Sequence, residues 1–456
     1  MGKAMQPTVL DREECRKARL SRDRRFDGQF FVAVKTTGIF CRPICPARLP
    51  NENNVEYFFN KIAAFDAGYR PCLRCRPESA PDSPAWRGVE ATFQRALTLI
   101  DNGSLHHQGI PCLSERLGIS DRYLRELFSR YLGMSPKKYA IYNQILFAKQ
   151  LLHSTQLPIT DIALASGFNS LRRFNDAFVK TMNLPPSHFR KSSPSKTAEH
   201  YIDITVNGEI DWPSMLDFYR ARAVIGLERV TAHCYERYFI LNGQRGWFSA
   251  RYLSKGVLRV KFQLDDLRSL KPLTVKLKRM FDLDCDIEVV EQHLSELEPN
   301  LIQSFGLRIP GVWDCWEAGV RAILGQQVSV KAAISQLNLL TQTLTSKQEL
   351  HFPTAKEVAD ADLAFLRMPQ SRKDTLTRFA THISQNPDSD PLTWTELKGI
   401  GPWTVNYVRL RGLSEPNCFL AEDLVVKKSL NIFNQLSTKS VSPWGSYATF
   451  HCWSRQ

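Results

Sequence analysis

The stretch Lys35-Thr-Thr-Gly-Ile-Phe-Cys41-Arg-Pro-Ile-Cys45-Pro-Ala-Arg48 carries two cysteines separated by three residues. A second pair follows in Phe65-Asp-Ala-Gly-Tyr-Arg70-Pro-Cys72-Leu-Arg-Cys75. Two close cysteine pairs joined by a loop supply the four sulfurs of one tetrahedral Zn²⁺ site. Arginines surround all four cysteines, which favours a thiolate held close to a phosphate. We therefore predict one zinc ion bound by Cys41, Cys45, Cys72 and Cys75.

The length and charge of the chain indicate several domains and a polyanionic partner. Its 456 residues are too many for one hydrophobic core and predict about three domains. The net charge is +14, and most of it lies in residues 1–195, which hold 29 Lys and Arg against 17 Asp and Glu. Such a basic half favours double-stranded DNA as the partner. An anionic membrane surface would compete, but no basic amphipathic anchor stands out.

The lack of recognisable targeting signals and the cysteine pattern favour a cytoplasmic location. The sequence has no run of about 18 apolar residues that would predict a transmembrane helix, and residues 1–6 lack the apolar core of a signal peptide. Of the eleven cysteines, the seven outside the quartet stand singly, which argues against a disulfide framework. We expect a cytoplasmic protein that associates with the nucleoid.

Composition and periodicity divide the chain into four segments. The segments are residues 1–80, 86–190, 200–290 and 291–456, with polar linkers at 80–84 and 191–199. The second segment is helical in pattern and repeats itself at an offset of 50 residues, where Leu124 recurs as Phe174, Phe128 as Phe178 and Leu132 as Met182. The third segment is β-rich, because residues 258–264 alternate between apolar and polar side chains. The last segment is mostly helical.

The cysteine segment has a more specific interpretation than a structural zinc site, which is the plain alternative. Residues 30–77 resemble the amino-terminal domain of the Ada family of adaptive-response proteins, including KTTGIFCRP and YRPCLRC. The resemblance implies that Cys41 accepts a methyl group from a DNA methylphosphotriester while the other three cysteines remain ligands. It also implies DNA backbone contacts from Thr37, Arg48 and Arg70. A redox-sensing cysteine site is a third, weaker interpretation.

Each copy of the helical repeat has the pattern of a helix-turn-helix. In the first, Gly118 stands in the turn between two short helices and Ser120 at the following N-cap. Residues 86–190 resemble the DNA-binding module of the AraC/XylS regulators, which implies a transcription activator that reads two consecutive turns of DNA and works with RNA polymerase. The second helix of each unit would enter a major groove, and phosphate contact alone is the alternative. The exposed candidates are Arg122, Arg125, Ser170, Arg172 and Arg173.

The sharpest motif of the last segment is Leu397-Lys-Gly399-Ile-Gly401, the turn of a helix-hairpin-helix. Its glycines permit a tight hairpin whose N–H groups face a DNA phosphate. Residues 200–456 resemble the AlkA-type 3-methyladenine DNA glycosylases, and the matching pieces include residues 319–329, 399–407, 419–423 and 443–453. The resemblance implies a catalytic aspartate at Asp423, which follows Gly401 by 22 residues.

Glycosidic bond cleavage explains why a carboxylate is needed, since the sugar develops oxocarbenium character that an anion stabilises. The target base must leave the duplex for a pocket, and aromatic faces attract a cationic base. By family position the pocket residues are Phe218, Trp403, Tyr407 and Trp453, although core packing is the plain alternative for each ring. Trp403 stands where lyase-active relatives carry a Lys nucleophile, so we expect base removal without strand cleavage.

Three positions depart from the AlkA pattern: Ala421 replaces a proline, Leu424 stands where an aromatic residue is sometimes found, and Gln327 replaces the leucine that wedges into the base stack. Gln327, alone or with Gln326, is the predicted wedge.

The sequence predicts a multi-domain α+β protein. It combines a small zinc-bound α/β domain, an all-α domain of two helix-turn-helix units, an antiparallel β-rich subdomain and an all-α helix-hairpin-helix glycosylase domain. Function is expected to join methyl-activated transcription regulation to excision of alkylated purines. The alternative is a purely regulatory zinc-stabilised DNA-binding factor whose second half grips DNA without catalysis.

Overall fold

The computed structural model describes residues 10–59, 61–72, 74, 75, 77, 89–101, 105, 109–190, 200–254, 256–345 and 351–455. The expected linkers at 80–84 and 191–199 lie outside the described residues. The chain forms two compact units, one of residues 10–202 with 266–272 and one of residues 203–265 with 273–455. The fold class is multi-domain α+β, as the sequence predicts. No helix in the described ranges is long and apolar enough to cross a membrane.

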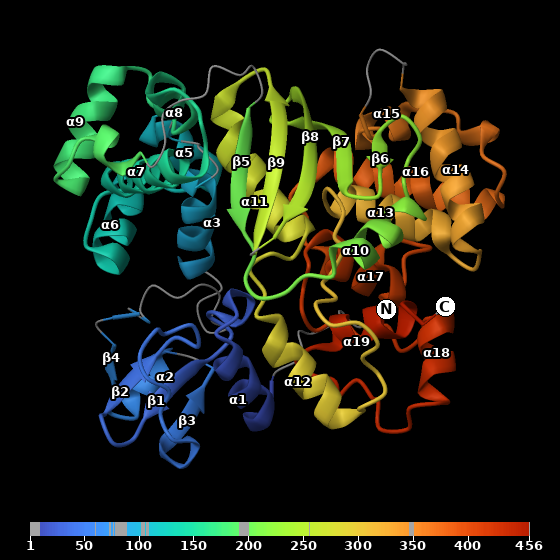
Figure 1. Cartoon of the computed structure of the whole chain (residues 1–456), viewed down its shortest axis with the longest axis horizontal. Helices are drawn as coiled ribbons and strands as arrows, with labels where there is room; N and C mark the ends of the chain where they lie inside the picture. Colours follow the sequence, from blue (N-terminus) through green and yellow to red (C-terminus); the bar gives the residue numbers. More distant parts are fainter. Residues whose placement is uncertain are drawn as a thin grey trace. The chain divides into compact units, whose positions relative to one another are not determined.

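The cysteine segment folds around a four-stranded sheet in the order β3-β1-β2-β4 (Figure 1). Its strands are β1 (Phe31–Val34), β2 (Ile39–Cys41), β3 (Val55–Phe58) and β4 (Arg70–Pro71), and its helices are α1 (Arg12–Ser21) and α2 (Lys61–Asp66). Asp11 begins α1 with a capping box, which satisfies N–H groups that a helix end leaves open. Phe31, Ala33, Phe40 and Ala64 form the small core.

Helices α5 to α9 form the double helix-turn-helix around the long helix α7 (Figure 1). Helix α3 (Val89–Asp101) precedes them. Their own bounds are α5 (Ile110–Leu117), α6 (Asp121–Leu132), α7 (Pro136–Ser154), α8 (Ile159–Ala165) and α9 (Leu171–Met182). Gly118 ends α5 in the left-handed conformation and the Ser120 hydroxyl caps α6, so both predicted turn signals are confirmed. Phe128, Phe174 and Phe178 are fully buried, as their spacing predicts.

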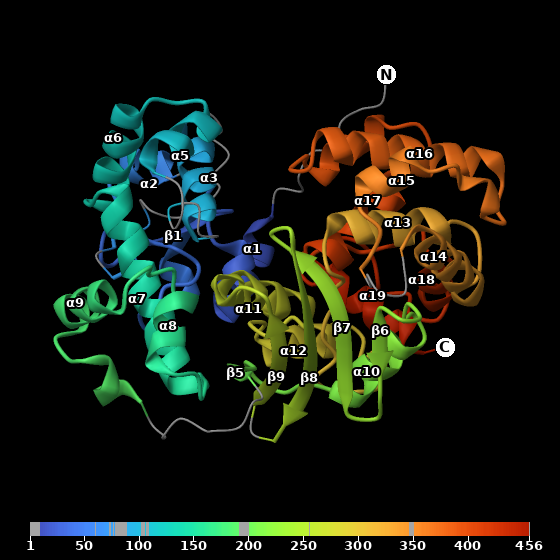
Figure 2. The same ribbon diagram turned by 90° about the horizontal axis from the view of Figure 1, so that it is seen from above.

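A five-stranded antiparallel sheet opens the second unit, in the order β5-β9-β8-β7-β6. The strands are β5 (Tyr201–Thr205), β6 (Glu228–Val230), β7 (Cys234–Leu241), β8 (Gln244–Leu253) and β9 (Val257–Leu264). Asn242 and Gly243 both have positive φ and close the β7–β8 hairpin, as a two-residue turn with the twist of paired strands requires. Helix α11 (Leu270–Met280) lies along one face of the sheet, and helix α10 (Trp212–Arg220) leads towards β6 (Figure 2).

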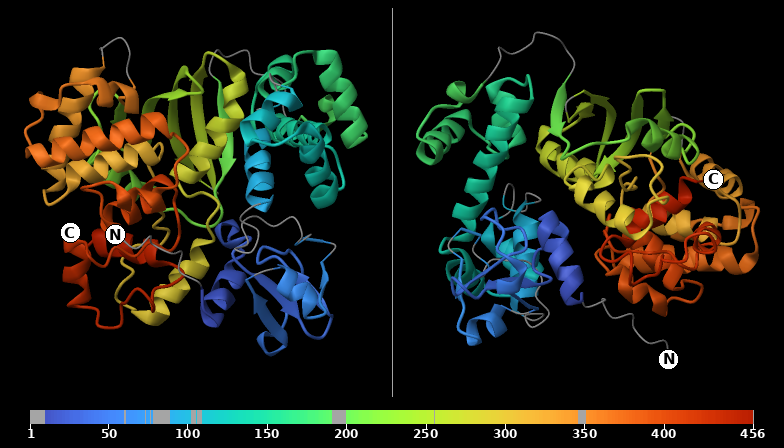
Figure 3. Two further views of the ribbon diagram at one scale, coloured as in Figure 1. Left: turned by 180° about the vertical axis from the view of Figure 1, so that it is seen from behind. Right: turned by 60° about the horizontal axis from the view of Figure 1, so that its bottom comes forward.

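The second unit also contains helix α13 (Cys315–Gly325), which is buried along most of its length and packs against α14, α16 and α17, and several further helices. They are α12 (Ile287–Leu297), α14 (Val330–Leu344), α15 (Ala355–Asp360), α16 (Gln370–Gln385), α17 (Pro402–Gly412), α18 (Leu424–Leu430) and α19 (Gly445–Trp453). Figure 3 shows this helical region from behind. Gly319 allows the Phe379 ring of α16 to lie directly on α13, where any Cβ would collide with it. The domain boundary proposed at residue 290 falls inside α12.

A buried charge network joins the sheet to α13. Glu317 of α13 accepts from Arg237 Nη1 of β7 at 3.1 Å and from Arg321 Nε at 2.8 Å. Glu228 of β6 accepts from Arg237 Nη1 at 3.1 Å and from Arg321 Nη2 at 2.9 Å. Burial alone would raise the pKa of Glu317, but Arg237 and Arg321 lower it to about 2. The network therefore holds two cations and two anions away from water, and loss of any member leaves a buried charge without its partner.

We expect Glu317→Gln to lower the free energy of unfolding of the glycosylase half by about 3–5 kcal/mol, because it leaves two buried guanidinium groups short of one anion. Urea unfolding followed by tryptophan fluorescence measures the loss. Because the folded pKa lies below the ordinary value of 4.5, the stabilisation is complete above pH 4.5 and is lost as pH falls towards 2. The exposed Glu396→Gln is the matched control, and equal stability of the two variants at pH 7 would contradict this role.

Candidate functional site

The four cysteines of the quartet lie together in the first unit. Their Sγ atoms are all within 4.8 Å of one another. Strands β2 and β4 bring the two pairs together, because they run parallel with Ile39 opposite Arg70, and Cys72 N–H donates to the Phe40 carbonyl at 2.9 Å. Cys45 N–H donates to the Arg42 carbonyl at 3.1 Å, which closes the turn within the first pair. Residues 30 positions apart therefore form one ligand cluster.

The donor set fits zinc, which the sequence predicts at this place. Tetrahedral coordination with Zn–S bonds of about 2.3 Å places sulfurs roughly 3.8 Å apart, and the observed separations of at most 4.8 Å are compatible with this. A hydrogen bond with Cys75 and burial raise the pKa of the Cys41 thiol far above its ordinary value, and burial raises the pKa of Cys45 to about 11. The hydrogen bond from Cys41 lowers the pKa of Cys75 to about 6. The thiols thus share protons that a dication would displace.

Arg42 anchors the cluster from within the first cysteine turn. Its backbone N–H donates to Cys75 Sγ at 3.3 Å, and its Nη1 donates to the Cys75 carbonyl at 3.4 Å. The rest of its guanidinium forms a bidentate pair with Asp27, whose side chain is buried. Groups of this kind fix ligand orientation around a metal. Sequence analysis did not single out Asp27, because nothing in the pattern places it beside the quartet.

The three residues expected to contact the DNA backbone are all exposed beside the quartet. Thr37 lies in the turn between β1 and β2, where its N–H donates to the Val34 carbonyl at 3.2 Å. Arg70 begins β4, and its N–H donates to the Gly38 carbonyl at 2.8 Å, so the sheet holds it next to that turn. Arg48 follows Cys45 by three residues. The guanidinium groups of Arg48 and Arg70 are therefore exposed beside the quartet, whereas the Thr37 hydroxyl donates to the Val34 carbonyl at 3.3 Å.

The candidate DNA-reading residues lie on α6 and α9. Arg122 and Arg125 are exposed on α6, and Arg172 and Arg173 are exposed on α9. Ser170 stands at the N-cap of α9, where its Oγ accepts from Arg173 N–H at 3.5 Å. The structure thus gives Ser170 a helix-capping role and places the four arginines at the surface.

The hairpin glycines lie between η8 (Pro391–Glu396) and α17. Gly399 has φ +95°, and a Cβ there would collide with the Thr375 side chain, so no other residue fits this turn. Gly401 is the N-cap of α17, has ordinary backbone angles and has open space around its Cα. Because Gly401 has no side chain, a phosphate can come close to the backbone N–H groups at the start of α17.

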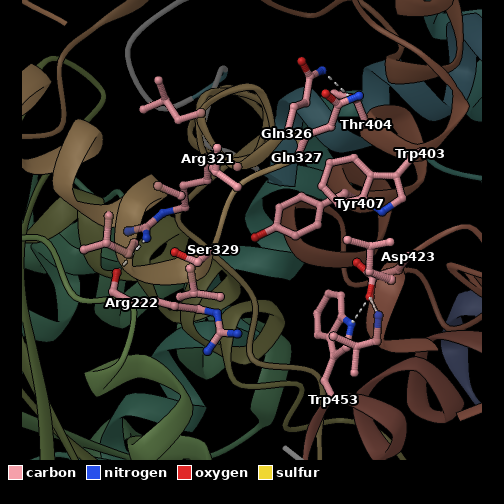
Figure 4. A pocket seen from close by; sticks show the side chains of 18 of the residues that line it. Arg222, Arg321, Gln326, Gln327, Ser329, Trp403, Thr404, Tyr407, Asp423 and Trp453 are labelled. Atoms are coloured by element: carbon pink, nitrogen blue, oxygen red, sulfur yellow. Dashed lines mark hydrogen bonds between the residues drawn. The ribbon is translucent and has the colours of Figure 1, made fainter. Parts of the chain in front are cut away.

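A pocket of about 1110 Å³ opens beside this hairpin in the second unit. Trp403 and Tyr407 of α17, Asp423, and Trp453 of α19 line one side, and Arg222 and Arg321 lie across from them (Figure 4). The Trp403 and Tyr407 rings are 5.4 Å apart, and the Tyr407 and Trp453 rings 6.3 Å apart. Three of the four predicted pocket rings thus meet around one carboxylate.

Asp423 is held rigidly at the pocket wall. It is the N-cap of α18, where its Oδ1 accepts from Val425 N–H at 3.0 Å and Val426 N–H at 3.4 Å. The same oxygen accepts from Trp453 Nε1 at 3.1 Å (Figure 4). Among the residues that the structure describes, no side chain or backbone group donates a hydrogen bond to Oδ2. One oxygen of the carboxylate therefore fixes its orientation while the other faces the pocket.

Phe218, the fourth predicted ring, lies behind the pocket wall and does not line it. The Arg222 guanidinium covers its face at 3.7 Å, and the Arg411 guanidinium lies 4.8 Å from the ring centre. The Phe218 ring also stacks on that of Trp453, with centres 6.3 Å apart, so Phe218 supports the pocket wall. Burial and the nearby Arg411 lower the pKa of Arg222 to about 10. Arg222 is a pocket residue to which the sequence pattern gave no role.

The two glutamines proposed for the wedge have different surroundings. Gln326 Nε2 donates to the Gly399 carbonyl at 3.1 Å and to Thr404 Oγ1 at 3.2 Å, so its side chain ties α13 to the hairpin (Figure 4). Gln327 is exposed at the pocket mouth and has φ +56°, a conformation unusual for a residue with a side chain. Backbone strain of this kind gathers at functional positions.

Comparison with protein families covers three parts of the chain. Residues 14–78 match the metal binding domain of Ada, residues 113–192 match a helix-turn-helix domain, and residues 202–314 match the AlkA N-terminal domain. A relative in Mycobacterium tuberculosis, named "probable bifunctional transcriptional activator/DNA repair enzyme AlkA", is 32% identical over 97% of this chain and 96% of its own length. The chain belongs to this family of bifunctional activator and DNA repair proteins.

Two further relatives each match only one part of the chain. The "DNA-3-methyladenine glycosylase 2" of Escherichia coli is 31% identical and covers 53% of this chain and 93% of its own length. The "bifunctional transcriptional activator/DNA repair enzyme AdaA" of Bacillus subtilis is 32% identical and covers 39% of this chain and 82% of its own length. The family thus unites in one chain two parts that occur separately elsewhere.

Proposed function

We propose that this family member takes up methyl groups from DNA phosphotriesters at Cys41 and hydrolyses the glycosidic bond of alkylated purines at Asp423. The observation that carries the enzyme proposal is the Asp423 carboxylate, fixed through Oδ1 and facing a pocket walled by aromatic rings. A site used only to grip DNA would need neither an oriented carboxylate nor a cavity large enough for a base.

Base release follows from the arrangement of Asp423. A flipped purine enters the pocket, and the C1′–N bond breaks with its electron pair leaving on the base. The Oδ2 atom of Asp423 stabilises the positive charge that develops on the sugar and orients a water, which adds to C1′ and loses a proton. An alkylated purine already carries a positive charge, so it leaves without strong acid assistance. The rings of Trp403, Tyr407 and Trp453 attract that cationic base through their faces.

Methyl transfer follows from the position of Cys41 beside the exposed arginines. Arg48 and Arg70, with Thr37, hold a phosphotriester near the cluster, and the Cys41 sulfur attacks the methyl carbon. The S–C bond forms as the C–O bond breaks, and the electron pair returns to oxygen, leaving a phosphodiester anion and a thioether. Cys41, Cys45, Cys72 and Cys75 would hold a zinc ion, which would keep their sulfurs deprotonated. The other three ligands, Cys45, Cys72 and Cys75, remain unmodified. Each protein molecule reacts once, because the methyl group stays on Cys41.

Two residues refine the glycosylase proposal. Trp403 provides no amine to attack C1′, so the reaction ends at an abasic site without strand cleavage. Gln327 fills the space that the flipped base leaves, because its strained backbone holds an exposed side chain at the pocket mouth. Gln326 contributes by fixing the hairpin. Gly399 and Gly401 present backbone N–H groups to a nearby phosphate.

The helical units give methyl uptake a regulatory outcome. Helices α6 and α9 bind a promoter in the major groove, and methylated Cys41 strengthens that complex, since a thioether removes negative charge from the cluster beside DNA. Recruitment of RNA polymerase completes the proposal, which places the chain on chromosomal DNA in the cytoplasm.

Incubation of the intact chain with alkylated duplex DNA tests the enzyme proposal directly. We expect free 3-methyladenine in the supernatant and DNA strands that stay intact until alkali cleaves the abasic sites. Chromatography of the released bases and a denaturing gel provide the two measurements. DNA binding without base release would favour the regulatory alternative, and strand breaks without alkali would contradict the role given to Trp403.

A further inference from the structure

The turn between α13 and α14 holds Gln327, the predicted wedge, in a conformation that its residue type disfavours. Helix α13 ends at Gly325, Ser329 caps α14, and Gln327 between them has φ +56°. The preceding residue, Gln326, has φ −59° and ψ 120°. These angles fit the two central positions of a type II turn, whose second position favours glycine because its φ is positive. A glutamine at that position therefore needs surrounding contacts that hold the turn.

Gln326, at the first central position of this turn, ties the turn to the hairpin of residues 397–401. Its side-chain Nε2 donates to the Gly399 carbonyl at 3.1 Å and to Thr404 Oγ1 at 3.2 Å (Figure 4). Gly399 lies in the hairpin itself, whereas Thr404 is buried in the first turn of α17. One amide group therefore fixes the turn before Gln327 against both the hairpin and the helix that follows it.

A second helix, α16, also holds the hairpin. Arg378 donates to the Lys398 carbonyl from Nη2 at 3.1 Å and from Nε at 3.3 Å, and its Nη2 also donates to Thr375 Oγ1 at 3.2 Å. Side-chain donors of the protein thus occupy the carbonyls of both Lys398 and Gly399. The N–H groups at the start of α17 have no partner inside their own helix, so they are the groups that this hairpin offers to a phosphate.

We propose that Gln326 is a positioning residue that couples the hairpin to the wedge: a phosphate bound by the hairpin holds Gln327, through Gln326, in the conformation that fills the gap left by the flipped base. The inference rests on the proposed functions of the hairpin and of Gln327. The phosphate restrains the hairpin backbone, the Gly399 carbonyl orients the Gln326 amide, and the turn keeps the positive φ of Gln327. Base displacement is thereby linked to correct binding of the DNA backbone.

A duplex that carries a stable abasic site beside 2-aminopurine tests the coupling, because 2-aminopurine fluoresces more strongly when the stack around it is disrupted. The full zinc-loaded chain should raise the fluorescence as Gln327 enters the gap. Gln326→Met keeps the length of the side chain and removes both hydrogen bonds. We expect it to lower the fluorescence change at saturating protein, and the maximal rate of base release, about tenfold. The dissociation constant of the duplex should change less than about twofold, because the hairpin N–H groups remain.

Gln370→Met is the matched control, since Gln370 is exposed and its Nε2 donates to Asp374 Oδ1 at 2.8 Å within α16. We expect it to leave both measurements unchanged. Replacing one DNA phosphate at a time by a neutral methylphosphonate adds a measurement on the unaltered protein. At the phosphate that the hairpin binds, the replacement should lower both the affinity and the fluorescence change at saturation. In Gln326→Met the same replacement should lower the affinity alone.

Three results would overturn the coupling alone: a full fluorescence change in Gln326→Met, a loss of affinity in that variant as large as its loss of fluorescence, or methylphosphonates that lower the affinity of the unaltered protein without lowering its fluorescence change. Circular dichroism verifies that Gln326→Met is folded, and the methylphosphonate measurement on the unaltered protein does not depend on it. An unaltered protein that binds the duplex with no fluorescence change would overturn the wedge function of Gln327 together with the coupling. A normal fluorescence change without base release would overturn the glycosylase proposal and leave the coupling in place.

Discussion

Asp423→Asn should lower the rate of base release from alkylated DNA by at least about 10²–10³-fold, because it removes the negative charge that faces the developing sugar cation. Asparagine keeps an oxygen that can accept from Val425 N–H and remains a good N-cap, so α18 should stay in place. Binding of abasic-site DNA should therefore change little. Single-turnover release of 3-methyladenine, measured together with DNA affinity, separates catalysis from binding.

Asp390→Asn is the matched control for this variant. Asp390 also caps a helical segment, where its Oδ1 accepts from Leu392 N–H at 2.9 Å, but it does not line the pocket. Full activity in Asp390→Asn and loss in Asp423→Asn would assign the effect to charge at the pocket. Near-normal release by Asp423→Asn would show that another group stabilises the sugar.

Cys41→Ser should abolish methyl uptake from methylphosphotriester DNA, because a serine hydroxyl is a far weaker nucleophile than a zinc-bound thiolate. Zinc should be retained with lower affinity by the three remaining sulfurs. Mass spectrometry of the protein after incubation with methylated DNA measures the uptake, and a chelator competition measures zinc retention.

Two controls make the result on Cys41 specific. Cys234→Ser changes a cysteine outside the quartet and should leave uptake intact. Peptide mapping of the unaltered protein should place the methyl group on Cys41 and on none of the other ligands, which is independent of whether the serine variant folds well. A methyl group on Cys45, Cys72 or Cys75 would contradict the assignment.

Local patterns in the sequence predicted much of the fold. The alternation at residues 258–264 lies in strand β9, and Gly118 and Ser120 form the turn and cap expected of a helix-turn-helix. These signals depend on neighbouring residues only, so the sequence shows them directly. The sulfurs of the quartet were likewise expected to meet, although the parallel pairing of β2 with β4 that brings them together could not be seen.

Features that depend on long-range contacts escaped prediction. Phe218 was expected to line the pocket, but it lies outside the lining, where Arg411 of α17 and Trp453 of α19, both distant in the sequence, contact its ring. The ion pair of Glu317 with Arg237 joins residues that are 80 positions apart in the sequence. No local sequence pattern predicts such a pair. Which glutamine is tied to the hairpin and which is exposed also depends on tertiary contacts.

A single incubation tests both proposed reactions most directly. The intact protein is incubated with DNA that carries both methylphosphotriesters and methylated purines, and protein mass and released bases are then measured together. We expect one added methyl group on each protein molecule, located at Cys41, and continuing release of 3-methyladenine that Asp423→Asn slows by at least about 10²–10³-fold. Protein that gains no methyl group, or DNA that releases no base, would contradict the claim that both repair reactions belong to this chain.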